Sequence, residues 1–179
     1  MLKTKLGTNS QINRIENSVQ NILNLQSNLR AYLNSHAAQK EEFLLEPFIN
    51  ERVELISSNY KNISFIVKET DLNLYTNKAA FTRIVDNLLS NAAKYNKMNG
   101  KVIIYSTKDK LFIEDTGKGI KNPKRVFDRF YKEQDRGIGI GLHIVKKLCE
   151  ELDISISLES EIGTGTTFKL NIHNLLKKA

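Results

Sequence analysis

The sequence predicts an α+β domain preceded by one long helix. Two patterns carry this prediction: residues 12–33 keep a heptad spacing of apolar side chains, and from Phe43 onward helix-like and strand-like segments alternate. The 179 residues are 40% hydrophobic and 26% charged, which is enough apolar material for a core and excludes a wholly disordered or fibrous chain. No apolar run approaches the roughly 20 residues of a membrane span, and the start lacks the apolar core of a signal peptide.

The long helix is predicted by seven positions spaced alternately three and four residues apart: Ile12, Ile15, Val19, Ile22, Gln26, Leu29 and Leu33. A single helix cannot bury such a stripe, so we expect a homodimer through residues 9–33, in a helical bundle. The alternative is a helix packed on its own domain. A lone Cys149 cannot form an internal disulfide, which favours a reducing, cytoplasmic location.

A polar linker at residues 34–42 separates this helix from the domain. Apolar spacing predicts helices over Pro47–Ser58, Ala79–Tyr95 and Gly141–Leu152. Alternating or β-branched runs predict strands over Ile63–Val67, Leu72–Tyr75, Val102–Ser106, Leu111–Glu114, Ile154–Leu158 and Thr166–Ile172. The span Thr116–Arg136 is predicted to be a long loop, with a short helical piece around Val126–Tyr131.

Positive charge is concentrated in that loop. Between Lys118 and Arg136 seven basic side chains face three acidic ones, in a chain of net charge +7. This pattern suggests an anionic partner such as a polyphosphate, although charge alone favours a solvated loop. We expect no nucleic-acid partner.

Two motifs contain side chains that can bind a metal ion or a nucleotide base. Asn87, Asn91 and Lys94 share one helix face, where carboxamide oxygens suit Mg²⁺ and Lys94 adds positive charge; the alternative is a polar outer face. The run Asp115-Thr116-Gly117-Lys118-Gly119-Ile120 follows a strand. Its carboxylate can accept a hydrogen bond from an exocyclic amine such as that of adenine; the alternative is a surface turn.

Two glycine-rich motifs follow. Gly137-Ile138-Gly139-Ile140-Gly141-Leu142 opens a helix and can expose backbone N–H groups to phosphates. Its spacing fits neither a Rossmann fingerprint nor a Walker A loop. The run Gly163-Thr164-Gly165-Thr166-Thr167-Phe168 taken alone indicates a hairpin turn.

Together and in this order, the motifs resemble the N, G1, F and G2 boxes of the ATP-binding domain of bacterial sensor histidine kinases, relatives of gyrase-type and chaperone ATPases. The boxes correspond to Asn87–Tyr95, Asp115–Ile120, Arg125–Lys132 and Gly137–Leu142, within a resemblance that covers residues 43–172. The resemblance implies a two-layer α/β sandwich of Bergerat type, with a mixed sheet covered by helices. It divides the chain into a partial dimerisation helix (1–36), an ATP-binding domain (37–174) and a tail (175–179).

The resemblance also implies the roles of individual residues. Asn91 would bind Mg²⁺, Asn87 and Lys94 would face the phosphates of ATP, and Asp115 would bind the adenine amine. Tyr95 would line the nucleotide pocket, and Gly119 with Thr166 or Thr167 would shape and support the wall beside Asp115. The remaining implied nucleotide contacts are Gly117 and Ile120, and Lys132, Gly137, Gly139, Gly141 and Leu142 toward the phosphates.

The implied function is transfer of the ATP γ-phosphoryl group to a His, for relay to an Asp of a response regulator. Hydrolysing relatives carry a general-base Glu where this chain has Asn87, a carboxamide that cannot take a proton at neutral pH. None of His36, His143 or His173 lies in a phosphoacceptor motif, so the acceptor is expected outside this chain. The alternatives are a dimeric interaction module with a vestigial pocket and a Ser/Thr kinase of the same superfamily.

Overall fold

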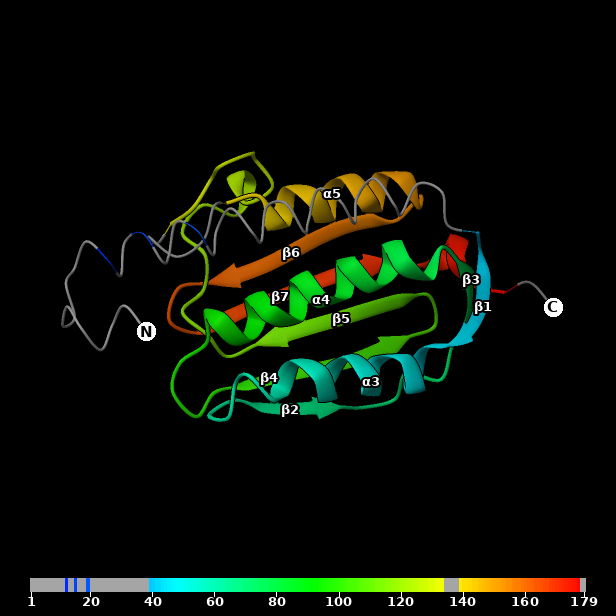
Figure 1. The fold of residues 1–179 in the computed structure, drawn as a ribbon, viewed down its shortest axis with the longest axis horizontal. Coiled ribbons are helices and arrows are strands. Elements are labelled where there is room, and N and C mark those ends of the chain that lie inside the picture. The colour runs from blue at the N-terminus through cyan, green and yellow to red at the C-terminus, as the bar shows by residue number, and fades with distance from the viewer. Residues whose placement is uncertain (1–11, 13–14, 16–18, 20–38, 134–138, 178–179) are drawn as a thin grey trace.

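A five-stranded mixed sheet with three helices on one face forms the body of the computed structural model, which describes residues 12, 15, 19, 39–133 and 139–177 (Figure 1). The strand order is β2-β4-β5-β7-β6, with β2 and β4 parallel and the other neighbours antiparallel. The strands are β2 (Ser64–Val67), β4 (Lys101–Thr107), β5 (Lys110–Asp115), β6 (Ser155–Glu161) and β7 (Gly165–Asn171). The implied mixed sheet covered by helices is therefore confirmed.

The covering helices are α3 (Leu45–Ser57), α4 (Lys78–Lys94) and α5 (Gly141–Glu151). Helix α4 lies between the other two over the sheet (Figure 1). Its first turn is capped by the Asn77 side chain, which accepts a hydrogen bond of 3.0 Å from the N–H of Ala80. Helix α3 begins two residues before the predicted Pro47, because a proline in the first turn sacrifices no helical hydrogen bond.

A small second sheet pairs β1 (Glu41–Leu44) with β3 (Asn73–Thr76) at the right-hand end of the view (Figure 1). Leu176 bridges to Leu74 beside it, after a 3₁₀ turn at His173–Leu175. Strand β1 was not predicted, because its two glutamates gave it the polar character of a linker. We call β1, β3 and Leu176 the ribbon.

The predicted short helix over Val126–Tyr131 is wrong. The helical turn there is a 3₁₀ piece at Pro123–Arg125, where the proline ring supplies the required φ. Phe130 then adopts a left-handed conformation with φ 62°, which no helix continues through. The other helices and strands predicted between residues 43 and 172 are present, with ends shifted by up to three residues.

The predicted long N-terminal helix and its dimer contacts lie outside the described residues, apart from Ile12, Ile15 and Val19. These three residues are helical, and Ile15 and Val19 are exposed. Within the described residues, no helix combines the length and apolar character needed to cross a membrane.

An aromatic cluster lies between the ribbon and the helices α3 and α4. The rings of Phe43, Phe48 and Phe81 pack with centroids 5.1–6.1 Å apart. Phe81 on α4 is fully buried at this junction. The three rings therefore connect the ribbon to helices α3 and α4.

Replacing Phe81 with Ala should lower the free energy of unfolding by about 3–5 kcal/mol, because it leaves a cavity in the core. Phe130→Ala is the matched control, since that ring is 61% exposed. Urea denaturation measures both variants, and equal losses would contradict the assignment of Phe81 to the core.

Candidate functional site

The predicted ligand-binding residues fall into two groups. The first surrounds Asp115 where β5 ends, and includes Tyr95, Gly117, Gly119, Ile120 and Thr166. The second lies where α4 faces the start of α5, and includes Asn87, Asn91, Lys94, Gly141 and Leu142. We call these the carboxylate group and the carboxamide group.

The carboxylate group is built around the half-buried side chain of Asp115. Asp115 stands opposite Thr166 in the β5–β7 register, and its Oδ1 accepts a 2.7 Å hydrogen bond from the N–H of Gly117. Burial raises the pKa of Asp115 to about 6, against the opposing effect of backbone hydrogen bonds from Gly117 and Thr166. A carboxylate kept from water in this way has a strong need for a further donor.

Two glycines let the backbone approach Asp115 closely, Gly117 at its carboxylate and Gly165 at its main-chain carbonyl. A Cβ on Gly117 would lie 2.6 Å from Asp115 Oδ1 and 2.7 Å from the Tyr95 carbonyl oxygen. Gly165 has φ 145°, and a Cβ there would overlap the carbonyl oxygen of Asp115. No other residue type fits these two positions without a backbone shift.

Ser160 joins the walls of this group and was not predicted. Its Oγ accepts a 2.8 Å hydrogen bond from the N–H of Ile120 and lies 3.0 Å from the Gly165 carbonyl and 2.8 Å from Thr166 Oγ1. A single serine in an alternating strand carries no sequence signal. Only the register, which places Ser160 opposite Thr166, reveals its position.

The carboxamide group depends on the close approach of α4 and α5. The Asn87 side chain donates its Nδ2 to the carbonyl of Arg83 at 2.8 Å, and a Cβ on Gly141 would lie 2.9 Å from Asn87 Oδ1. Asn91 and Lys94 follow one and two turns later on the same helix face. Lys94 Nζ lies 5.2 Å from the ring centroid of Tyr95, which links the two groups.

The loop between β5 and α5 contains the remaining predicted residues. Lys132 is exposed, and Gly139 has φ 75° and accepts a 2.9 Å hydrogen bond from the N–H of Phe130. Gly137 lies outside the described residues. His143 Nδ1 lies 3.1 Å from the Phe127 carbonyl, which ties the loop to α5.

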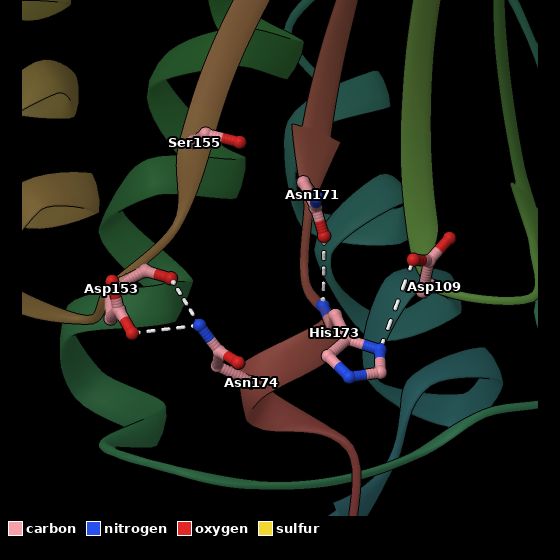
Figure 2. Close-up of a pocket in the computed structure, with 6 residues that line it drawn as sticks. All are labelled: Asp109, Asp153, Ser155, Asn171, His173 and Asn174. Atoms are coloured by element: carbon pink, nitrogen blue, oxygen red, sulfur yellow. Dashed lines mark hydrogen bonds and ion pairs between the residues drawn. The ribbon is translucent and has the colours of Figure 1, made fainter.

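A polar cavity of about 440 Å³ lies at the other end of the sheet (Figure 2). Asp109 Oδ2 faces His173 Nδ1 across 3.8 Å, and Asp153 Oδ2 accepts a 2.7 Å hydrogen bond from Asn174. The other lining residues are Ser155 and Asn171. Because Asp109 precedes β5 and Asp115 ends it, this cavity is remote from the predicted ligand-binding residues.

Gly165→Ala should lower the free energy of unfolding by about 2–4 kcal/mol, because the new methyl group forces β7 away from Asp115. Gly163→Ala, in the same turn with φ 84° and open space beside it, should cost about 1 kcal/mol. Chemical denaturation gives both values. Equal costs would mean that the close approach at Gly165 is not a constraint.

Known proteins resemble this chain in both sequence and structure. Residues 76–175, more than half of the chain, match the family model described as histidine kinase-, DNA gyrase B-, and HSP90-like ATPase. Sensor protein SrrB of Staphylococcus aureus is 38% identical in an alignment 102 residues long, and the match covers 50% of this chain and 18% of that protein. The chain therefore spans less than a fifth of the length of this relative.

Several solved structures also superpose on this chain. The mycobacterial sensor histidine kinase MprB superposes with a TM-score of 0.65 and 26% identity, over 73% of this chain and 95% of that one. The catalytic domain of histidine kinase ThkA gives a TM-score of 0.64 and 25% identity, over 75% and 95%. ShkA in complex with AMPPNP, at 20% identity, shares the fold with a TM-score of 0.74 over 95% of this chain and 39% of that one.

The family match covers the two strands and the helix that carry Asp115, Thr166 and the carboxamides. It includes all fourteen predicted ligand-binding residues, from Asn87 to Thr166. The chain therefore belongs to the histidine kinase-, DNA gyrase B-, and HSP90-like ATPase family, which confirms the prediction of a sensor histidine kinase catalytic domain.

Proposed function

We propose that this chain binds ATP with Mg²⁺ between the carboxylate and carboxamide groups and transfers the γ-phosphoryl group to a His outside the chain. An Asp of a response regulator would receive it next. The observation that carries the proposal is Asp115, a half-buried carboxylate with a raised pKa at a strand end, which accepts a hydrogen bond from the backbone of Gly117. SrrB, MprB and ThkA are named as sensor proteins or histidine kinases, which supports the same proposal.

The carboxylate group suits the adenine base. Gly117 donates to one oxygen of Asp115, and the carboxylate has further acceptor capacity for the exocyclic amine. The backbone at Gly117 and Gly165 presents no side chains toward Asp115, which suits a flat ligand. The hydrogen bonds of Ser160 hold Ile120 and Thr166 in fixed positions around it.

The residues of the carboxamide group fit a magnesium–triphosphate ligand. Gly141 keeps the space beside Asn87 Oδ1 free of a side chain, and Asn91 presents a neutral oxygen ligand one turn further on. Magnesium bound here would neutralise phosphate charge. Lys94 and the basic loop add positive charge, so this chain contributes mainly by positioning and charge compensation.

The arrangement favours transfer to a protein over hydrolysis. Asn87 stands where a base for water would be needed and cannot accept a proton. The neighbouring acid, Asp86, is directed toward α3, where its Oδ1 accepts a 2.9 Å hydrogen bond from Arg52 Nε. Neither side chain is therefore available to deprotonate a water beside the phosphates.

We also propose that the chain forms a homodimer through residues 9–33. Its protein partner would be a response regulator, and its location the cytoplasm. The heptad spacing of that segment supports the dimer.

Affinity for a non-hydrolysable ATP analogue should fall as the pH drops through about 6, because Asp115 is then protonated and loses its charged acceptor. Folding stability has the opposite pH dependence to nucleotide affinity. A folded-state pKa above the unfolded value means that the protonated carboxyl favours the fold at low pH, and this contribution is lost as the pH rises through 6.

Asp115→Asn should therefore be at least as stable as the parent at pH 7 while it loses most of its nucleotide affinity. The carboxamide keeps the Gly117 contact, but its NH₂ group faces the amine of the base as a second donor. Calorimetric titration and thermal unfolding measure the two properties. Unchanged binding by this variant would exclude Asp115 as the base contact.

Phosphoryl transfer should be detected when the chain is mixed with Mg²⁺, labelled ATP and a separate fragment that carries an acceptor His. Asn91→Ala should reduce the rate by at least about tenfold, since it removes a proposed metal ligand. Ser90→Ala, at the helix position just before Asn91, is the control. Acid-labile label identifies phosphohistidine; acid-stable label would indicate a Ser/Thr kinase, and no transfer would favour an interaction module.

A further inference from the structure

Glu133, at the end of the first described part of the β5–α5 loop, gathers three hydrogen-bond donors on one carboxylate. Its Oε2 accepts a 2.9 Å bond from the N–H of Lys121, and its Oε1 accepts 2.8 Å bonds from the N–H of Asn122 and the hydroxyl of Tyr131. Residues at the two ends of segment 121–133 are thereby joined. We call this segment, closed by Glu133, the clamped loop.

The electrostatics keep this clamp charged. Partial burial raises the pKa of Glu133, but the donors from Lys121, Asn122 and Tyr131 and the charge of Lys121 outweigh it, so the pKa lies below the ordinary value. The clamp is therefore fully ionised at neutral pH. Hydrogen bonds to an ionised acceptor are the stronger kind.

The inside of the clamped loop is also ordered. The Arg125 guanidinium lies 4.8 Å from the ring centroid of Tyr131, and its Nε lies 3.4 Å from Asp128 Oδ2. Val126 is buried, and the Phe127 carbonyl meets His143 of α5. The clamp thus closes a loop that is already attached to the body of the domain.

We propose that Glu133 is a positioning residue, which fixes the clamped loop before nucleotide binds and so sets where the adjacent Lys132 meets the phosphates. This inference rests on the proposed function. Segment 121–133 carries five of the basic side chains of the loop: Lys121, Lys124, Arg125, Arg129 and Lys132. Without the clamp their mutual repulsion favours open conformations, and the nucleotide must supply the cost of ordering them.

The first arm of the test needs no nucleotide. Limited trypsin digestion after Lys124 and Arg125 reports on loop opening, at bonds distant in sequence from position 133. Glu133→Ala should speed this cleavage about fivefold, and Tyr131→Phe, which removes one donor of three, by less. Glu161→Ala, the loss of an exposed carboxylate on β6, is the control and should cleave like the parent.

The second arm compares calorimetric titrations with Mg²⁺ and a non-hydrolysable ATP analogue and with adenosine. Glu133→Ala should weaken the triphosphate about fivefold and leave adenosine within twofold, because Lys132 acts on the phosphates only. Thermal unfolding should show the same midpoint for all variants.

Unchanged cleavage would overturn the clamp itself. Faster cleavage with unchanged triphosphate affinity, or an equal loss for adenosine, would overturn the positioning role and leave a purely local contact. A parent chain that binds neither ligand would refute the proposed function and the positioning role together, while the digestion arm would still show whether Glu133 holds the loop.

Discussion

The candidate ligand site depends on the placement of one carboxylate at the end of a central strand. Asp115 is half-buried because β5 lies between β4 and β7 and under α4, and its ionised form is disfavoured there. The fold supplies only backbone donors, from Gly117 and Thr166, and no cationic side chain is among the causes of its pKa. An ion pair would lower that pKa and satisfy the carboxylate internally, whereas this environment leaves it ready for an external donor.

Helix α4 packs against both α3 and α5. On one side Asp86 binds Arg52 of α3, and on another Asn87 lies against Gly141 at the start of α5. The apolar stripe between them, which includes Phe81 and Leu88, is fully buried. The polar residues of this helix are therefore divided between stability and ligand binding by their angular position.

Much of this could be predicted from local sequence. The glycine and carboxamide motifs are contiguous, and their residue types limit what the backbone and side chains can do, so the sequence alone identifies Asp115, Asn91 and Gly141 as candidates. Ser160 was not, because its importance comes from cross-strand register and not from any local pattern. Strand β1 was missed for a similar reason: its pairing with β3 outweighs the low strand propensity of Glu41 and Glu42. The clamp at Glu133 likewise joins positions that no periodicity relates.

The ribbon also holds the two ends of the described domain together at one edge. The Glu42 carboxylate bonds both Asn73 and Lys177, so the first strand of the domain and its last described residue are fastened at one edge. Anything attached ahead of Glu41 and anything attached behind Lys177 would emerge side by side there, at the opposite end of the view from the tip of β5 (Figure 1). A pull or twist on either tether would then load the same short β-pair, at the end of the sheet away from Asp115.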